Sequence, residues 1–453
     1  MLDSAEARLD GSIVARFAEV ALIFGVALAV LAFGGTEPVS FALVQIIFLA
    51  TAALLVAKMP QSLAGSLSAW GFVVPAVLAA VVLTQLIPLP AHLALSMEPY
   101  ATRTHFLILL TCVIVFYLAQ MVSENRKRKE RLIVSLLALG TVEAFYGLVQ
   151  YLSGWQHIFF FVKKYDLEEA TGTYINRNHF AGMLEMILPF SVALLFYEYE
   201  KFRGRGSSAP ANIKDVLTRQ SLQRLLLCLF VAVVLFAALF FSRSRMGIAA
   251  ACASLILIFG LAGISRFHGK MGLALSAAFV ALSIGLAFWI GPGPIVERFA
   301  GVGQELTAHD QSRLAIWRDA RPLVRQNAVL GTGLGTFPIA YTAVQTTFLS
   351  QFVNHAHNDY LELASDLGLP AALVLFGGIF WILARAVRTF LRARGSFERS
   401  VALGCAGSIA AILLHSMADF NLYIPSNALL FALVLGIAAS TRRANLERPE
   451  PQT

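Results

Sequence analysis

The sequence has few charged residues. Only 14% of its 453 residues are Asp, Glu, Lys or Arg, whereas a soluble domain carries about 25%. Hydrophobic residues make up 58% of the chain, and the mean hydropathy is +0.71. This composition excludes an ordinary soluble protein and indicates an integral membrane protein.

Cysteine is also scarce. The four cysteines, Cys112, Cys228, Cys252 and Cys405, all fall within apolar runs. Their positions match neither a disulfide framework nor a metal-binding cluster. We therefore interpret them as small apolar residues of buried or lipid-facing helices.

Long apolar runs dominate the chain. A membrane-spanning helix needs about 20 mostly apolar residues, and the backbone of a segment within lipid must be helical or part of a closed barrel. The first run, 13–33, exceeds the roughly 7–15 apolar residues of a signal peptide, so we expect a spanning helix there. The sequence predicts an all-α membrane protein with about twelve transmembrane helices, at approximately 13–34, 38–57, 69–88, 104–122, 131–153, 179–199, 223–242, 246–263, 271–291, 369–391, 400–418 and 424–440.

The basic residues predict the orientation. Most of the 35 Lys and Arg residues fall on one side of the predicted spans, in loops 123–131, 200–206, 265–270 and 385–399 and in the C-terminal tail. Because cytoplasmic loops are enriched in Lys and Arg, we expect both termini to be cytoplasmic. The chain then divides into helices 1–9 (1–291), a large, partly helical periplasmic loop (292–367), and helices 10–12 with the cytoplasmic tail (368–453).

Two arginines occupy an unusual place between spans seven and eight. The segment SRSRMG (242–247) leaves almost no loop there, so Arg243 and Arg245 lie at the outer membrane boundary, where the positive-inside rule disfavours them. One interpretation is a structural ion pair or a contact with lipid headgroups. The other is a clamp for a phosphate-bearing lipid, because guanidinium binds phosphate in a bidentate manner.

Two further segments carry basic and polar residues at the same boundary. GTYINRNHFAG (172–182) places Arg177, Asn178 and His179 before span six, where Asn178 is either a helix cap or a ligand-binding residue. SRLAIWRDARPLVRQ (312–326) predicts an amphipathic helix with one apolar face and one basic face, which faces either the membrane interface or an anion. Pro322 predicts a kink or an end to this helix. The apolar face comprises Ile316, Ala320 and Leu323, and the basic face Arg313, Trp317 and Arg321.

A glycine-rich segment follows in the same loop. GTGLGTF (331–337) resembles a dinucleotide-binding loop but lacks the preceding strand and the βαβ context. We interpret it as a flexible turn.

The most polar stretch is FVNHAHNDYLELASDLGLPA (352–371). Asp359 and Glu362 match a capping box, which predicts a helix beginning at Tyr360. His357 and Asn358 would then precede a helix N-terminus, a position that attracts anions. A histidine there either caps the helix or exchanges a proton near neutral pH, whereas His355 lies further out and is the weaker candidate. The HxH pattern lacks a third ligand, so we predict no metal.

Acids and a further histidine lie close to or within the spans. His415, Asp419 and Asn421 end span eleven near the outer surface. Glu143 and Glu185 lie within spans five and six. Ionisable residues inside a membrane are candidates for function by default.

Taken together, five segments resemble those of the O-antigen ligase and O-antigen polymerase superfamily: GTYINRNHFAG, SRSRMG, SRLAIW, HNDYLELASDLGLPA and HSMADFNLYIPSNALLF. The resemblance covers nearly the whole chain. It implies a GT-C-like, metal-independent glycosyltransferase of the bacterial inner membrane, without a cofactor. Such enzymes move a glycan from undecaprenyl pyrophosphate to an acceptor sugar hydroxyl, such as that of lipid A-core, at the periplasmic face.

The resemblance also implies roles for individual residues. The two essential arginines of the family correspond to Arg245 and Arg313, and its histidine corresponds to His357; these are the predicted catalytic residues. The predicted substrate-binding residues are Arg243, Arg177, Asn178, His179, Asn358, Tyr360, Arg321 and Asp419.

Alternatives remain at this stage. Nothing in the sequence separates a ligase from an O-antigen or exopolysaccharide polymerase that uses the same donor. A secondary transporter or flippase is a second alternative, which Glu143 and Glu185 favour and the absence of an internal repeat opposes. The expected partners are the lipid-linked donor, a glycan or lipid A-core acceptor and membrane lipids, with no nucleic acid.

Overall fold

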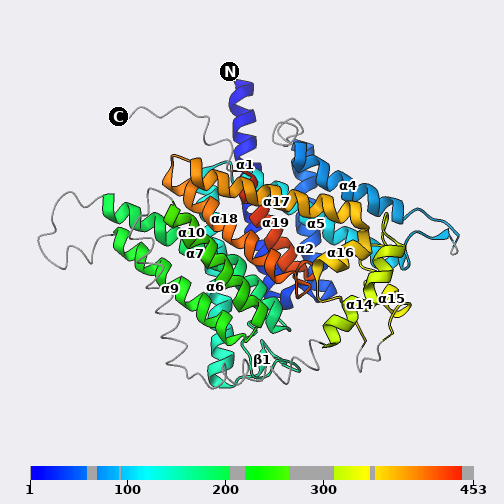
Figure 1. Ribbon diagram of the computed structural model, residues 1–453. Helices are drawn as coiled ribbons and strands as arrows, with labels where there is room; N and C mark the ends of the chain where they lie inside the picture. Colours follow the sequence, from blue (N-terminus) through cyan, green and yellow to red (C-terminus); the bar gives the residue numbers. More distant parts are fainter. Residues whose placement is uncertain are drawn as a thin grey trace, which may run out of the picture.

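The computed structural model describes residues 2–58, 69–90, 93–204, 220–264, 311–346 and 352–440. Figure 1 shows helices packed side by side, with the start of α1 at the top of the view and the short hairpin at the bottom. The elements are α1 (Leu2–Leu31), η1 (Phe33–Gly35), α2 (Pro38–Lys58), α4 (Ala69–Gln85), α5 (Pro99–Val122), α6 (Arg126–Ser153), β1 (His157–Ile158), β2 (Phe161–Val162), α7 (Arg177–Gly204), α9 (Gln220–Phe241), α10 (Arg245–Ile264), α14 (Gln311–Gln326), α15 (Phe337–Thr342), α16 (Asp359–Leu367), α17 (Leu369–Arg392), α18 (Ser396–His415), η4 (Asn421–Tyr423) and α19 (Pro425–Ser440).

The predicted all-α membrane fold is confirmed. Within the described residues, nine helices are long and apolar enough to cross a membrane: α1, α2, α5, α6, α7, α9, α10, α17 and α18. Two shorter apolar helices, α4 and α19, match two further predicted spans. The predicted span at 271–291 lies outside the described residues, so the total of twelve and the full extent of the large loop stay predictions.

Helix α7 is the central helix of the bundle. In its most apolar window 94% of the residues are buried, against 28% for the peripheral helix α2. Helix α18 packs closely on α7, because a Cβ added at Gly404 would meet the Phe190 ring at 2.7 Å. Glycine therefore permits this approach, and the two most buried spans form the core on which the polar residues are placed.

Ion pairs mark one end of the bundle, which we term the basic end. Lys129 pairs with Glu398 at 2.8 Å, and Arg399 pairs with Glu200 at 2.7 Å. Arg131 Nη2 donates to Glu19 at 2.7 Å. The described residues of the loops that the sequence assigns to the cytoplasm, 123–131, 200–204 and 385–399, thus contribute to one end of the structure.

The opposite end, which we term the site end, gathers η1, the residues before α7 and the start of α19. The Tyr174 hydroxyl donates to Asn427 Oδ1 and accepts from Ser426, at 3.0 Å each. A Cβ at Gly34 would meet the Tyr174 ring at 2.7 Å. Because α1 ends and α19 begins here, Leu2 and Ser440 lie toward the basic end. The first and last described residues thus lie at the same end of the bundle, whereas the location of the termini and the side of the membrane stay predictions.

Helices α14, α15 and α16 pack at the site end, and α14 does not end at Pro322, one of the two outcomes predicted for that residue. It continues through Pro322 to Gln326. The apolar face is confirmed, because Ile316, Ala320 and Leu323 are buried. Pro322 lies on the exposed side of the helix, so water can hydrate the carbonyl of the preceding turn that receives no hydrogen bond from proline. The burial of Leu323 holds the next turn in place.

The glycine-rich turn is ordered, so its interpretation as a flexible segment is wrong. Gly331, Gly333 and Gly335 all have positive φ values, from 72° to 114°. The Gly335 N–H donates to Asp366 Oδ2 at 2.6 Å, and the Thr332 N–H donates to the Ser365 carbonyl at 2.9 Å. The glycines therefore let the chain wrap closely around the end of α16.

Candidate active site

Helix α16 begins one residue earlier than predicted. Its N-cap is Asn358, whose Oδ1 accepts the Leu361 N–H at 3.0 Å, so the capping box assigned to Asp359 is wrong. Asp359 is buried instead, where it accepts from the Ser416 hydroxyl at 2.6 Å and from the Leu422 N–H at 3.2 Å. Asn358 and Asp359 both have short polar side chains that could cap the helix. Because Asp359 is buried and bonded elsewhere, Asn358 is the cap.

His357 precedes this cap in a left-handed conformation, with φ of 50°. Its Nδ1 lies 3.7 Å from Asp419 Oδ1, and its side chain is 34% exposed, whereas that of Asp419 is 2% exposed. The carboxylate therefore faces Nδ1 from inside the protein.

Asp419 is the common neighbour of two histidines. Its Oδ1 lies 3.9 Å from His179 Nε2 and accepts the Phe420 N–H at 2.9 Å. Burial alone raises the pKa of Asp419, but the facing imidazole of His357 and the nearby imidazoles of His179 and His415 lower this pKa well below its usual range. The buried residue therefore supplies a carboxylate that can orient the imidazole of His357.

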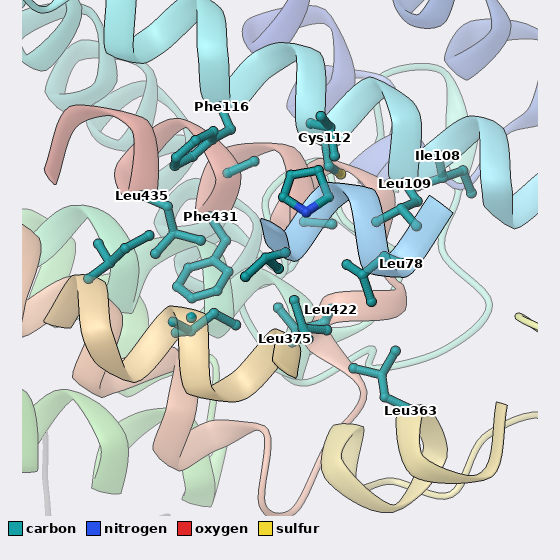
Figure 2. A pocket seen from close by; sticks show the side chains of 18 of the residues that line it. Leu78, Ile108, Leu109, Cys112, Phe116, Leu363, Leu375, Leu422, Phe431 and Leu435 are labelled. Atoms are coloured by element: carbon teal, nitrogen blue, oxygen red, sulfur yellow. The ribbon is translucent and has the colours of Figure 1, made fainter. Parts of the chain in front are cut away.

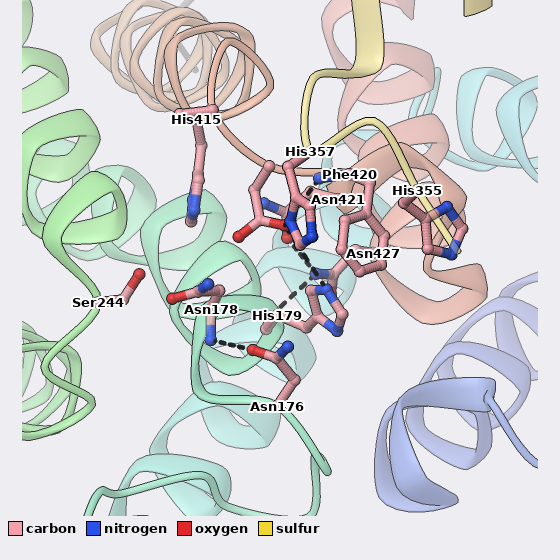
Figure 3. A network of polar contacts seen from close by, with 12 residues as sticks. Asn176, Asn178, His179, Ser244, His355, His357, His415, Phe420, Asn421 and Asn427 are labelled. Atoms are coloured by element: carbon pink, nitrogen blue, oxygen red, sulfur yellow. Dashed lines mark hydrogen bonds and ion pairs between the residues drawn. The ribbon is translucent and has the colours of Figure 1, made fainter. Parts of the chain in front are cut away.

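The Phe420 ring separates two imidazoles (Figure 3). His355 stacks on it with ring centroids 3.9 Å apart, and His357 meets it edge-on at 5.0 Å. His179 contacts the same ring at 4.7 Å. Two histidines of one loop and a third from the start of α7 are thus held around one aromatic side chain.

His355 is not the outlying loop residue that the sequence suggests. Its Nδ1 lies 2.7 Å from Glu362 Oε1, and the Ala356 N–H donates to Glu362 Oε2 at 2.7 Å. Burial raises the pKa of Glu362 to about 8 and lowers the pKa of His355 to about 4. Burial therefore favours the uncharged form of both members of this pair.

Helix α14 contacts the two loops that carry His357 and Asp419. Arg313 Nη1 donates to the Ala418 carbonyl at 2.9 Å, directly before Asp419. Trp317 Nε1 donates to the Ala356 carbonyl at 2.8 Å, directly before His357. Arg321, on the same predicted face, is exposed. The first two residues of the face thus join the centre, and substrate contact by Arg321 stays a prediction.

The α9–α10 junction has the predicted abrupt form. Helix α9 ends at Phe241 and α10 begins at Arg245. Arg243 Nη1 lies 3.4 Å from Glu168 Oε2, which supports the ion-pair interpretation for this residue. A Cβ at Gly247 would meet the Ala181 Cβ at 2.6 Å. The start of α10, with the half-buried Arg245, therefore packs beside the start of α7.

The segment before α7 also differs from expectation. Asn176, not Asn178, bonds to the first turn, because its Oδ1 accepts the Asn178 N–H at 2.8 Å. The Arg177 guanidinium pairs with Glu169 and lies 3.7 Å from Asp166. These acids satisfy Arg177 without a ligand, so substrate binding by Arg177 and Asn178 stays a prediction.

Asn358 and Tyr360 hold α16 on α18. Asn358 Nδ2 donates to the Met417 carbonyl at 3.0 Å, and the Tyr360 hydroxyl donates to the Leu413 carbonyl at 2.8 Å. The Tyr360 ring packs on Phe376. These contacts explain both residues structurally, and their contact with substrate also stays a prediction.

Both acids inside the spans have protein partners. Glu143 accepts from the Thr173 N–H and hydroxyl at 2.9 Å each, which fixes the segment before α7. Glu185 lies 3.0 Å from His415 Nδ1, and both residues are fully buried. Both acids thus have contacts within the protein that support structural roles.

Several residues of the site were not predicted. The sequence pattern singles out neither Phe420 nor Asn427, and it predicts only a capping role for Glu362. Asn427 Nδ2 donates to the His179 carbonyl and to Asn421 Oδ1, at 2.9 Å each. The polar run after an apolar span is the one signal in the sequence for these contacts.

An apolar cavity of ≈ 210 Å³ lies beside this centre (Figure 2). Helices α4, α5, α17 and α19 line it, and Leu363 and Tyr423 contribute to the lining at the site end. The lining residues of α19 run from Ala428 to Ala439. The cavity therefore lies along α19, beside the neighbourhood of the histidines.

The donor set does not resemble a metal centre. Within the described ranges, no group of three or more His, Cys, Asp and Glu residues is placed to hold a metal ion. The prediction of a metal-independent reaction is not tested by this observation and stays a prediction.

The fold and the site define a polytopic membrane protein with histidines, carboxylates and arginines gathered at one end of a helical bundle. The family model described as O-antigen ligase matches residues 230–376, about a third of the chain. This match confirms the resemblance to the O-antigen ligase superfamily. The matched range includes Arg245, Arg313 and His357. Among curated proteins, none matches the chain.

Proposed function

We propose that this protein transfers a glycan from undecaprenyl pyrophosphate to a sugar hydroxyl of lipid A-core, as an O-antigen ligase. The observation that supports this most directly is the His357–Asp419 pair, with His357 partly open and Asp419 buried. Arg313 donates to the carbonyl next to that aspartate. A base and a cation are thus adjacent at a place that a lipid-linked substrate can reach.

The proposed step is a displacement at the anomeric carbon. The acceptor O–H transfers its proton to Nε2 of His357, and its oxygen forms the new glycosidic bond. The bond between the anomeric carbon and the phosphate oxygen breaks, and the electron pair leaves with the lipid pyrophosphate. General base catalysis of this kind contributes about 10²–10⁴-fold.

Arginines take the role that a metal has in many phosphate sites. Arg245 and Arg313 stabilise the charge that develops on the leaving pyrophosphate, and Arg243 and Arg177 lie further out at the same end. Three helix N-termini, those of α7, α10 and α16, add positive ends of helix dipoles near this place. The proposed reaction therefore requires neither a metal nor another cofactor.

The reaction takes place at the periplasmic face of the inner membrane in this proposal. The ion-paired basic loops at the opposite end support it, because Lys and Arg are enriched on the cytoplasmic side. The apolar cavity beside the histidines is suited to part of the donor lipid.

A polymerase is the runner-up, because it uses the same donor and the same base. The two differ in the acceptor, which is lipid A-core for a ligase and a second lipid-linked glycan for a polymerase. A transporter or flippase receives no support from Glu143 and Glu185, since both are bonded within the protein.

The test is a transfer assay with the purified protein in vesicles that contain EDTA. A lipid-linked donor is offered with lipid A-core or with a second donor molecule, and the products are identified by mass spectrometry. A donor–core product that is absent with His357→Ala supports a ligase. Lengthened lipid-linked glycan indicates a polymerase, and no product in the wild-type protein without a divalent cation contradicts the mechanism.

A further inference from the structure

A short hairpin at the site end exposes large aromatic side chains. It comprises residues 155–165, with strands β1 and β2 in antiparallel register. Phe160 at its tip is 96% exposed, and Phe161 and Tyr165 are exposed by 63% and 69%. Trp155 and Phe159 are also exposed. Exposing a group of large aromatic side chains to water is unfavourable, and such a group marks a surface that contacts a membrane or another protein.

The hairpin folds back along a spanning helix. The Phe159 N–H donates to the Tyr146 hydroxyl at 2.7 Å, and Gln150 Nε2 donates to the His157 carbonyl at 2.7 Å. Tyr146 lies about two turns before the end of α6, roughly 10 Å along the axis at 1.5 Å per residue. The hairpin therefore lies alongside the end of the span.

The aromatic surface continues the lipid-facing stripe of α6. Val142, Phe145, Val149 and Leu152 are all exposed, and their spacing places them on one face of the helix. Leu152 is followed after three residues by Trp155, which packs edge-on against Tyr146 with ring centroids 5.8 Å apart. One exposed apolar surface thus extends from the middle of a spanning helix to the hairpin tip.

We propose that the hairpin is an interfacial membrane anchor that inserts its aromatic tip, led by Phe160, into the lipid at the site end. The occupant of this surface is bilayer lipid and not a protein partner, because the surface continues the exposed apolar face of a helix that is long and apolar enough to cross the membrane. Trp and Tyr beside exposed Phe residues suit the interface, where aromatic rings accumulate at headgroup level.

The anchor is connected to the arginines of the site. Directly after it, Glu168 pairs with Arg243, and Asp166 and Glu169 pair with Arg177. Lys163 Nζ donates to the Glu169 carbonyl at 3.0 Å, which closes the turn between the hairpin and these acids. The inserted hairpin therefore fixes the depth at which Arg177 and Arg243 meet lipid headgroups. This inference does not depend on the proposed reaction.

The test measures the depth of the tip. A variant without the four native cysteines receives a single cysteine at Phe160, and a nitroxide label on it is studied by electron paramagnetic resonance. Vesicles of phosphatidylethanolamine and phosphatidylglycerol without donor or acceptor hold the protein. Labels at Leu152, on the lipid-facing stripe, and at Arg325, exposed on α14, are the matched references.

We expect the ratio of oxygen to nickel-chelate accessibility at residue 160 to equal that at residue 152, several-fold above that at residue 325. A ratio equal to that at residue 325 overturns the proposal, and so does protection from both reagents, which indicates a protein cover. If the cysteine-free protein does not fold, Phe160→Trp in the native background replaces it. Brominated phospholipids should then quench the added fluorescence, and quenching by aqueous iodide alone overturns the anchor.

Discussion

The Nδ1 atom of His357 lies 3.7 Å from Oδ1 of Asp419, although 62 residues separate the two in the sequence. Each side of this pair is fixed by its own backbone. His357 has a positive φ directly before the α16 cap, and Asp419 accepts the N–H of Phe420, whose ring His357 contacts. Holding a bulky residue in a left-handed conformation is unfavourable, so the surrounding packing must maintain it.

We predict that His357→Ala lowers the rate of glycan transfer by about 10²–10⁴-fold. Asp419→Asn should lower the rate by less, because it removes the carboxylate that orients the imidazole but leaves the base in place. The double variant should be no slower than His357→Ala, since the two residues act as a unit. Transfer rates of the two single variants and the double variant check this. A wild-type rate in His357→Ala contradicts the assignment.

Arg245→Lys and Arg313→Lys should be nearly as damaging as the alanine variants. Lysine keeps the charge but lacks the planar fork that binds pyrophosphate with two hydrogen bonds. Arg325→Ala is the matched control, because Arg325 is exposed in the last turn of α14. Donor binding and transfer are measured separately for each variant. Full activity in both lysine variants shows that charge alone is sufficient and rejects the bidentate clamp.

The sequence predicts the helices well, because about 20 apolar residues in a row have one stable backbone form in lipid. It also predicts the apolar face of α14, where Ile316, Ala320 and Leu323 follow helical spacing and are all buried. Periodicity reports which face of a helix is buried. It does not report which distant element covers that face.

The pairings within the site could not be predicted for this reason. Asp419 meets His357 through the packing of α16 against the end of α18, and Glu362 meets His355 because Asn358, not Asp359, caps α16. The fixed turn around Gly333 likewise depends on the buried Asp366. The local composition of such a segment predicts a loop. Contacts with residues distant in the sequence determine whether that loop has one fixed conformation.

Glu362 supplies a prediction about pH. Its pKa is raised to about 8, so the folded protein favours the neutral carboxyl, and this contribution to stability is lost as pH rises towards 8. The pKa of His355 is lowered from 6.5 to about 4, so its contribution to stability increases with pH up to about 6.5. Below pH 6.5 this increase opposes the loss that Glu362 causes. Thermal stability of the wild-type protein should therefore fall between pH 6.5 and about 8 relative to Glu362→Gln. Glu362→Ala should be less stable than Glu362→Gln at every pH, since it leaves the Ala356 N–H without an acceptor. Parallel pH profiles of the wild type and the glutamine variant contradict this account.

The orientation can be tested with two exposed positions at opposite ends. In the cysteine-free background, Arg325→Cys lies at the site end and Lys127→Cys lies beside the ion pairs of the basic end. A membrane-impermeant thiol reagent should label residue 325 in intact spheroplasts and residue 127 after lysis. The reverse pattern places the histidines in the cytoplasm and contradicts the proposed orientation.

The apolar cavity makes the last prediction. Leu375 of α17 lines it, whereas Leu373 on the same helix is exposed away from it. Leu375→Trp should fill space that the polyprenyl chain would occupy, and each displaced CH₂ group loses about 0.8 kcal/mol of burial. The KM for a long-chain donor should therefore rise more than the KM for a short-chain donor, with little change in kcat, because the variant leaves His357 and the arginines unchanged. Leu373→Trp should change neither constant, because it adds bulk on the lipid-facing side. An equal effect of Leu375→Trp on both donors indicates disturbed packing and rejects the cavity as the site of the lipid chain.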